Sequence, residues 1–411
     1  MSAASPAAPT SLKSDAAVIS AVGFAHATSH FFHFVLPPLF PWLMHEFGLG
    51  FTQVGAAMTV FFVVSGVGQA LAGFVVDRVG ALRVLVFGVG ALSFAAFAIA
   101  SARNYPMLLA AAGIAGLGNC VFHPADYSLL NRRVTPARLG HAFSVHGLTG
   151  SLGWAAAPPF VLALATTWSW RVAAMGAGVV GLVALAVLLL NHRQLDDSAA
   201  RAEAARRAGG SFGFLGVGVV WMCFAFFLVA VMAFGGLQNF AAPIFQRSYG
   251  VTLAYATTGL TAYLLASAAG TAMGGFFASK GQHQERLVGA CLAGAAACSI
   301  ALASTLVPAW SLPALMALMG FGVGFTGPSR DILVRRAATS RFGSGAYGRI
   351  YGFVYSGIDT GLAIAPIVFG TLMDAGRYSG VLWGVALLQT LAIVTALSVG
   401  SRSRQNPSAP A

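Results

Sequence analysis

Long apolar segments follow one another along almost the whole chain, and each is close to the length needed to cross a membrane. About 20 apolar residues in a helix span the ~30 Å hydrocarbon core of a bilayer. The sequence predicts twelve such spans, which cover residues 18–44, 54–76, 82–101, 107–130, 142–166, 172–190, 214–240, 253–278, 287–306, 312–334, 350–372 and 381–399. We therefore expect an all-α integral membrane protein.

The composition agrees with this expectation. Hydrophobic residues make up 57% of the chain and charged residues only 8%, whereas soluble domains carry about a quarter charged residues. So little charge cannot coat a surface that faces water, so lipid must solvate much of the protein. The net charge of +12 resides in short loops between apolar runs. Basic residues in such loops indicate how the spans are oriented in the membrane, and they do not form the clustered basic surface that binds nucleic acid.

Basic residues are divided unequally between the two sides that the spans define. Eighteen of the 23 Lys and Arg residues fall on the side that holds both termini, and four fall on the other. Arg330 is the only basic residue placed inside a span. Short loops rich in Lys and Arg stay in the cytoplasm. We expect a multi-pass protein of the cell (inner) membrane with both termini cytoplasmic.

The stretch from Gly116 to Arg133 recurs later in the chain. Gly116, Gly118, Pro124 and Arg132 reappear as Gly320, Gly322, Pro328 and Arg336, each 204 residues further on. A repeat at half the chain length indicates two halves built alike, which is typical of transporters. An even number of spans in each half makes the copies parallel repeats, related by an axis along the membrane normal.

The longest polar interruption runs from His192 to Ser211 and separates six spans from six. It predicts the following organisation: a cytoplasmic tail at 1–17, a six-helix bundle at 18–191, a cytoplasmic linker at 192–212, a second six-helix bundle at 213–400 and a cytoplasmic tail at 401–411.

Several classes of function are disfavoured. The four cysteines lie in apolar segments without a CxxC pair, so we expect core packing and no disulfide framework. The polar N-terminus lacks the pattern of a cleaved signal peptide. The chain has no P-loop, HExxH or GxSxG motif. We expect no enzyme, no cofactor and no ATP-driven pump, so any uphill transport must use an ion gradient.

The segment GFVVDRVGALR, from Gly73 to Arg83, resembles the loop motif between spans 2 and 3 of the major facilitator superfamily. Gly73, Asp77, Arg78, Gly80 and Arg83 match that motif. The second-half counterpart, GGFFASKGQHQER from Gly274, is degraded. The resemblance covers essentially the whole chain. It implies the major facilitator fold, with two six-helix bundles that rock between inward-open and outward-open states.

A shorter run, CVFHPAD from Cys120 to Asp126, is similar to the Phe-His-Pro segment of fosmidomycin-resistance-type exporters. In those proteins an acidic residue commonly follows the proline directly, whereas here Ala125 intervenes. The resemblance implies export of a small organic compound.

Burial of an ionisable group in a membrane span costs free energy, so each such residue is a candidate functional residue. The carboxyls are Asp126, Asp331 and Asp359, and Arg330 is the one cation, so the formal charge is −2. Burial favours the neutral form of a carboxyl. We therefore expect at least one of these carboxyls to take up protons, which is the physical basis for predicting proton coupling.

Depth along the helices separates two groups of candidates. Asp126 and Arg330 lie in the cytoplasmic half, at equivalent positions of the repeat. We interpret them as a gate pair or as contacts to the loop motif; alternatively, Arg330 anchors an anionic substrate. The predicted gate residues are Asp77, Arg78, Arg83, His123, Asp126, His146 and Asp331. His123 precedes Pro124, which invites a kink.

The second group lies near the middle of the membrane. Asp359 is about ten residues into its span, with Tyr355 one turn away. His26, His30 and His33 share one face of span 1 and could bind protons or substrate. Metal ligation by this face stays an alternative, although one helix face cannot close a coordination shell. The predicted substrate or proton site consists of His26, His30, His33, Asn119, Gln238, Asn239, Arg330, Tyr355 and Asp359.

Together these observations predict a monomeric, proton-coupled secondary transporter of a small organic compound, with an anionic compound as one option and with export favoured. The alternative is a proton-coupled importer of a carboxylate-like metabolite, followed by a metal carrier that uses the histidines of span 1. The expected partners of the protein are the substrate, protons and the lipid bilayer, and not nucleic acid.

Overall fold

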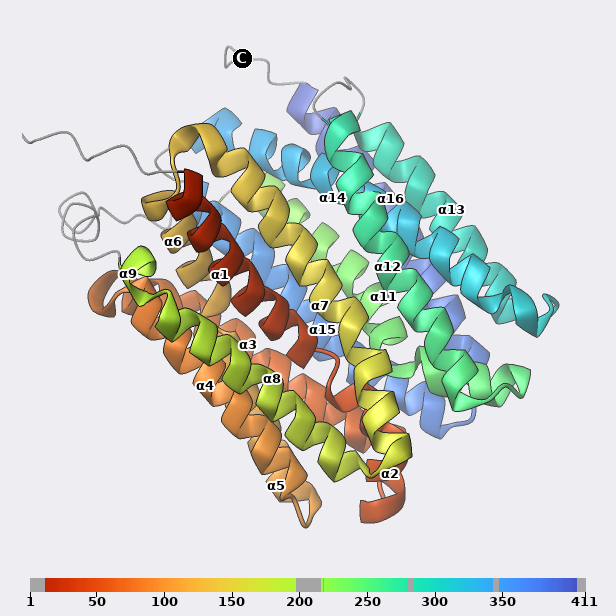
Figure 1. The fold of residues 1–411 in the computed structure, drawn as a ribbon. Coiled ribbons are helices and arrows are strands. Elements are labelled where there is room, and N and C mark those ends of the chain that lie inside the picture. The colour runs from red at the N-terminus through yellow and green to blue at the C-terminus, as the bar shows by residue number, and fades with distance from the viewer. Residues whose placement is uncertain (1–11, 197–215, 217, 279–283, 343–346, 405–411) are drawn as a thin grey trace, which may run out of the picture.

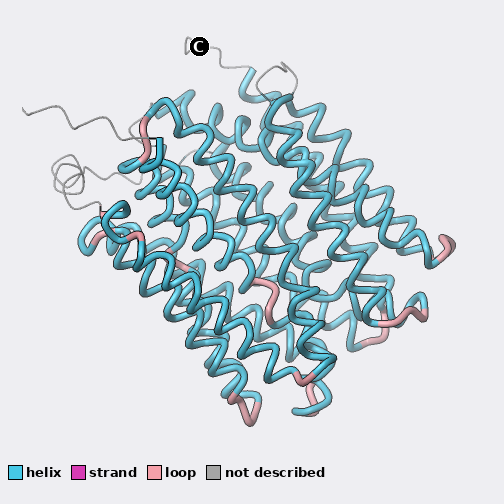
Figure 2. Tube along the Cα trace, in the orientation of Figure 1, coloured by secondary structure: helices cyan, strands magenta, loops and turns pink. Residues whose placement is uncertain are grey.

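The computed structural model describes residues 12–196, 216, 218–278, 284–342 and 347–404; several side chains within these ranges, including Asp77 and residues 328–352, are outside the description. Regular structure in the described part is helical (Figure 2). Most of the linker predicted at 192–212 lies outside the described residues. The domain boundaries therefore stay predictions.

Helices of the first half pack mainly with one another. They are α1 (Leu12–Phe32), α2 (Leu36–Phe47), α3 (Phe51–Val79), α4 (Ala81–Ala100), α5 (Tyr105–Asn119), α6 (Phe122–Arg133), α7 (Leu139–Thr167), α8 (Trp170–Leu190) and the short α9 (His192–Leu195). They form the red to yellow-green side of the molecule in Figure 1.

The second half forms the green to blue side (Figure 1). Its helices are α11 (Gly218–Tyr249), α12 (Leu253–Ala278), α13 (Gln284–Ser304), α14 (Leu312–Phe342), α15 (Tyr347–Asp374) and α16 (Tyr378–Arg404). The start of α1 and the end of α16 lie at the same end of the molecule (Figure 1). This agrees with an even number of crossings.

The described helices correspond to the twelve predicted spans, with α1 and α2 forming the first and α5 and α6 the fourth. Ten spans are long and apolar enough to cross a membrane by length and composition, counted over the described residues. The two predicted spans outside this set are the first, which carries three histidines, and α12, which is rich in small and hydroxyl residues.

Two spans are interrupted in their middle. The first breaks between Phe32 and Leu36, directly before Pro37, which cannot donate a backbone hydrogen bond. The fourth breaks at Cys120 and Val121, as the kink expected from Pro124 predicts. Discontinuous helices free backbone groups and are typical of transport sites.

The repeated glycines have equivalent contacts in the two halves. A Cβ on Gly116 would collide with the backbone oxygen of Phe61 on α3, and one on Gly320 with that of Tyr263 on α12. Glycine lets neighbouring helices approach closely in lipid. The 204-residue repeat therefore marks equivalent helix crossings, which agrees with two halves built alike.

The two halves meet along α3 and α15, which run antiparallel. At one end Asp374 accepts hydrogen bonds from the backbone nitrogens of Phe51 and Thr52, at 2.6 and 2.9 Å. Further along, Gln69 Nε2 donates to Asp359 Oδ2 at 3.1 Å. From Phe51 to Gln69 the contact extends over roughly 27 Å of helix. The halves are thus packed together from the end remote from the termini to the middle of the molecule.

Candidate functional site

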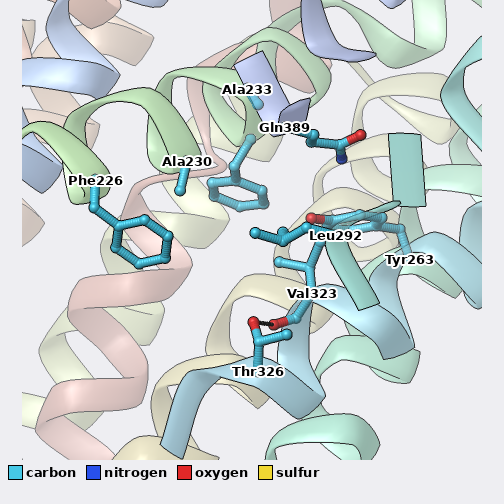
Figure 3. Close-up of a pocket in the computed structure, with 9 residues that line it drawn as sticks. Phe226, Ala230, Ala233, Tyr263, Leu292, Val323, Thr326 and Gln389 are labelled. Atoms are coloured by element: carbon cyan, nitrogen blue, oxygen red, sulfur yellow. Dashed lines mark hydrogen bonds between the residues drawn. The ribbon is translucent and has the colours of Figure 1, made fainter. Parts of the chain in front are cut away.

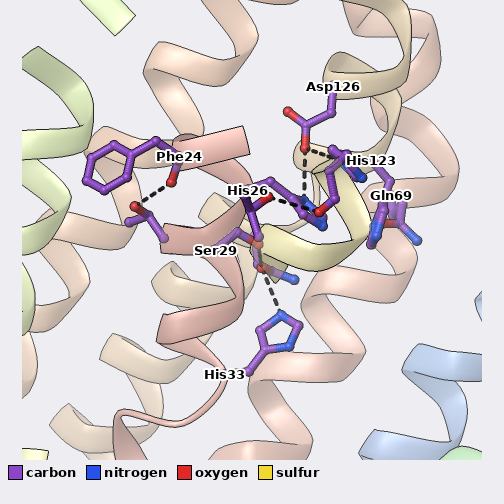
Figure 4. A network of polar contacts seen from close by, with 11 residues as sticks. Phe24, His26, Ser29, His33, Gln69, His123 and Asp126 are labelled. Carbon is purple, nitrogen blue, oxygen red and sulfur yellow. Dashed lines mark hydrogen bonds and ion pairs between the residues drawn. The ribbon is translucent and has the colours of Figure 1, made fainter. Parts of the chain in front are cut away.

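Asp126 belongs to a mostly buried polar cluster in the first half (Figure 4). Its Oδ2 atom is 3.0 Å from Nε2 of His146, within a hydrogen bond. It is also 3.0 Å from Nδ1 of His26, although that nitrogen makes no hydrogen bond because the ring is not aligned for one. The carboxylate therefore lies between imidazoles from α1 and α7.

The imidazoles also contact one another. The rings of His26 and His146 are stacked, with centroids 3.6 Å apart and planes at 22°. His30 lies 4.3 Å from His26 and stacks on Trp154 at 4.4 Å. Helical spacing on α1 places His26 and His30 on one face, and Trp154 on α7 closes that face.

His33 belongs to a hydrogen-bonded chain in which each donor can be assigned. The indole of Trp154, which can only donate, contacts Nδ1 of His33 at 3.1 Å. Nδ1 must therefore accept, so Nε2 carries the hydrogen and donates to Asn119 Oδ1 at 3.1 Å. Asn119 also accepts from Ser29 and donates to Ser65. These contacts hold His33 as one neutral tautomer.

A second chain connects the two halves of the molecule. Nδ1 of His123 lies 2.9 Å from Oε1 of Gln69, and Nε2 of Gln69 donates to Asp359 on α15 at 3.1 Å. Asp359 is buried, with 9% of its surface exposed. Since an amide oxygen only accepts, Nδ1 of His123 carries a hydrogen in this arrangement. One glutamine thus joins the histidine cluster to a carboxyl of the other half.

Most predicted site residues that the structure describes gather around these two chains. His26, His30, His33, His123, His146, Asn119 and Asp126 form one connected cluster, and Asp359 joins it through Gln69. Gln238 donates to the backbone oxygen of His33 at the break in span 1. Asn239 instead bonds within its own helix, to the oxygen of Gly235. Tyr355 packs on Phe227, 4.8 Å between ring centroids.

The structure brings together residues that depth along the sequence assigned to two groups. Depth along the sequence assigned Asp126 to a gate and His30 to the middle of the membrane, but Asp126 touches His26 directly. His26 lies one turn before His30 on α1, nearer the end that holds the termini, which is also the end to which the sequence assigned Asp126. Arg78 and Arg83 are exposed. The side chains of Asp77, Arg330 and Asp331 lie outside the described residues.

Four residues of these chains were not predicted from the sequence: Gln69, Trp154, Ser29 and Ser65. Gln69 is an amide inside an apolar span, which is a signal of the same kind as Gln238 and could have been used. Trp154 and the serines offered no such signal, because tryptophan and serine are common in membrane helices. Their contacts depend on neighbours about 50 to 120 residues away in the chain.

The second half contains a small cavity of about 30 Å³, which is room for one or two water molecules. Gln389, Tyr263 and Thr326 are its polar lining residues, and the rest are mainly apolar (Figure 3). Oε1 of Gln389 is buried without a hydrogen-bond partner. This cavity is separate from the histidine cluster and is too small for an organic substrate.

Comparisons with known proteins agree with the fold. The profile of the Major Facilitator Superfamily matches residues 22–347. A bacterial homologue of the human lysosomal transporter Spinster, solved in an inward-facing and occupied conformation, superposes with a TM-score of 0.74 at 15% identity, covering 97% of this chain and 98% of that one. The chain belongs to the Major Facilitator Superfamily.

Relatives within the superfamily have diverse names. The fosmidomycin resistance protein of Escherichia coli is 23% identical over 66% of this chain and 68% of its own length. The uncharacterised transporter YfnC of Bacillus subtilis is 24% identical over 92% of each chain. A probable L-galactonate transporter of Escherichia coli is 25% identical over 34% of this chain and 31% of its own length. The chain is thus similar to transporters of small organic compounds.

Proposed function

We propose that this protein is a proton-coupled secondary transporter of a small organic compound and that Asp359 carries the coupled proton. The observation that supports the proposal most is the bridge from Asp359 through Gln69 to His123. It is a polar connection between two bundles that must move relative to each other during alternating access. Protonation of Asp359 in the second half can therefore change the hydrogen bond that His123 makes in the first half.

The chemistry of an amide explains how. When Asp359 is ionised it can only accept, so the NH₂ group of Gln69 faces it and the amide oxygen faces His123. When Asp359 is protonated its hydroxyl can donate, and the amide can turn to present its oxygen. His123 then faces an NH₂ group instead of an oxygen. The protonation state of Asp359 on α15 therefore influences the hydrogen bond between Gln69 and His123 in the first half.

Other groups around Asp359 are consistent with this role. Gly66 on α3 lies against it, since a Cβ there would be 2.9 Å from Cβ of Asp359. Two residues further along α3, a Cβ on Gly68 would lie 2.7 Å from Sγ of Cys120, at the break in span 4. Tyr355 lies one turn away on α15. Among the described side chains, no arginine or lysine pairs with Asp359.

Substrate binding is proposed at the face formed by His30, Asn119 and Gln238, beside the breaks in spans 1 and 4. These side chains supply hydrogen bonds at the place where helices are discontinuous. We propose export, because a transporter that confers resistance removes the compound, and one relative is a fosmidomycin resistance protein. The proposed location is the inner membrane, with both termini in the cytoplasm.

A second candidate is proton-coupled import of a carboxylate-like metabolite. It is supported by two shorter similarities, to the probable L-galactonate transporter and to a probable 4-methylmuconolactone transporter of Cupriavidus pinatubonensis, the latter 30% identical over 39% of this chain and 37% of its own length. The two candidates share the coupling residue and differ in direction.

Proteoliposome flux tests the proposal. Fosmidomycin and L-galactonate serve as probes, and a trapped pH dye reports proton movement with and without an imposed pH gradient. We expect the gradient to drive accumulation of a probe by the wild type, and Asp359→Asn to abolish this while leaving exchange at equilibrium.

Glu46→Gln is the matched control, because Glu46 is an exposed carboxylate paired with Arg171 within the first half. It should accumulate the probe like the wild type. Gradient-driven accumulation by Asp359→Asn at the wild-type rate would show that another group carries the proton.

A further inference from the structure

We propose that His26, His30 and His123 form a binding site for a divalent transition-metal ion of the zinc type. One ring nitrogen from each of these residues lies within 4.8 Å of the other two. Neutral imidazole is a preferred ligand of zinc, and three histidines with one open position are a recurrent catalytic zinc set. His26 is buried while His30 and His123 are partly exposed, so an ion can reach the site.

The free nitrogen of each ring follows from its other contacts. Nδ1 of His26 lies at Asp126 and Nδ1 of His123 at Gln69, which leaves Nε2 of both rings for an ion. Nδ1 of His30 is buried without a hydrogen-bond partner. His33 is excluded, because Trp154 and Asn119 already occupy both of its nitrogens. The site therefore differs from the face of span 1 that the sequence indicated.

Two of these nitrogens pack directly against Gly150 on α7. A Cβ at this position would lie 2.9 Å from Nε2 of His26 and 2.8 Å from Nδ1 of His30. The two nitrogens therefore lie beside the same backbone position, and a side chain larger than hydrogen there would displace the rings. An unpaired nitrogen and an available Nε2 this close together are consistent with a shared metal ion.

The surroundings of the site resemble the outer shell of known metal centres. Ligating histidines usually donate their second ring N–H to a carboxylate or a carbonyl, which fixes the tautomer. Asp126 Oδ2 is 3.0 Å from Nδ1 of His26, so a small ring rotation would complete that bond. Gln69 Oε1 already accepts from Nδ1 of His123 at 2.9 Å. A bound cation would also offset the buried charge of Asp126, which no described lysine or arginine contacts.

A competing triad consists of His26, Asp126 and His146. Its geometry is less suitable, since the rings of His26 and His146 are stacked 3.6 Å apart at only 22°. Imidazole lone pairs lie in the ring plane, and two nearly parallel planes at this separation do not meet at one nearby ion. We therefore assign the site to the triad that includes His123.

The test is titration of the purified full-length protein with ZnCl₂ by calorimetry, after removal of any affinity tag. The background variant replaces the four histidines outside the cluster, His45, His141, His192 and His283, by Asn. We expect one zinc ion per protein. We also expect Co²⁺ to give the intense absorption of a tetrahedral site.

His30→Gln and His123→Gln should each weaken zinc binding by more than about 100-fold, and Asp126→Asn by about 10- to 100-fold. Gly150→Ala keeps every ligand but would displace the two rings that pack on it, so it should also weaken binding. His33→Gln is the matched control in the same span, at its break, and should bind zinc like the background variant. Elution as a single monodisperse peak shows that each variant is folded.

Two results would overturn the assignment. One is an absence of stoichiometric zinc binding by the folded background variant. The other is loss of binding in His146→Gln with retention in His123→Gln, which would place the ion in the competing triad. The measurement does not involve transport or a pH gradient. Failure of this inference is therefore distinguishable from failure of the proposed coupling.

Discussion

Histidines that look alike in the sequence differ in what their neighbours allow them to do. His33 is held between a donor, Trp154, and an acceptor, Asn119. If His33 took up a second proton, Nδ1 would carry a hydrogen, and this N–H would face the indole N–H of Trp154, so that two donors would point at each other. His30, one turn earlier, has a nitrogen without a partner. Of the two, only His30 can accept a proton or a ligand without breaking an existing hydrogen bond.

This difference predicts the effect of Trp154→Phe. Phenylalanine keeps a ring to stack on His30 but removes the N–H that satisfies His33, whose side chain is buried. A buried acceptor left unpaired costs about 1–3 kcal/mol. We expect a loss of thermal stability in detergent of that order, and a mixture of His33 tautomers by ¹⁵N NMR.

Trp383→Phe is the control for this prediction, because Trp383 is 49% exposed on α16. It should melt within error of the wild type. If Trp154→Phe also leaves stability and the His33 tautomer unchanged, the donor assignment in this chain is wrong.

At the scale of helices, the close crossings made by the repeated glycines define a test of the two-fold architecture. Gly116 and Gly320 face the backbones of α3 and α12, where an added Cβ meets a carbonyl oxygen that cannot move aside. We expect Gly116→Ala and Gly320→Ala each to lower stability by about 1–3 kcal/mol, because the helices must separate. The melting temperature in detergent is the measurement.

The chain supplies a matched pair of controls for this effect. Gly90 and Gly294 are also 204 residues apart, and a Cβ on either would meet nothing within 4 Å. Alanine is favoured over glycine in a helix by about 1 kcal/mol. Gly90→Ala and Gly294→Ala should therefore leave stability unchanged or raise it. Equal destabilisation by all four substitutions would contradict the packing explanation.

For the whole molecule, alternating access requires contacts that hold one end closed to be broken and remade. Asp374 of the second half caps the N-terminus of α3 in the first half, through Phe51, Thr52 and the Thr52 hydroxyl. A carboxylate at a helix N-terminus is favoured by the unpaired N–H groups and the helix dipole. This contact stabilises the state that is closed at the end remote from the termini.

We expect Asp374→Ala to shift the population toward the state open at that end. Asp374 is exposed, so solvent weakens the contact, but a loss of only about 1.4 kcal/mol changes the ratio of states tenfold. Spin labels at exposed Trp168 and Leu306, in a background without the native cysteines, should report a larger fraction of long distances. Glu46→Gln, whose partner Arg171 lies in the same half, should give the wild-type distribution.

Much of the architecture could be predicted from the sequence, because the periodicity of long apolar segments and the repeat are local signals. The spans, the kink before Pro124 and the equivalence of Gly116 and Gly320 all follow from residues close together in the chain or at a fixed separation. So does the presence of His26 and His30 on one helix face. These properties depend on helix geometry alone.

The candidate site could be predicted only in part. The residue types were identifiable, since ionisable groups in lipid are few. Their grouping was not, because the contact between Asp126 and His26 joins residues 100 positions apart in the chain, and only helix packing sets that distance. Trp154 gave no indication of its role, because its partner His33 is 121 residues away.

The sequence by itself therefore determined a helical membrane protein with two similar halves and a small set of polar residues inside it. Only the tertiary structure decided which of those residues act together. Gln69 joins Asp359 to His123, and Trp154 removes His33 from the set of available ligands. The reason is physical: hydrogen bonds and metal coordination depend on distances of about 3 Å between atoms, and only packing of distant helices sets those distances.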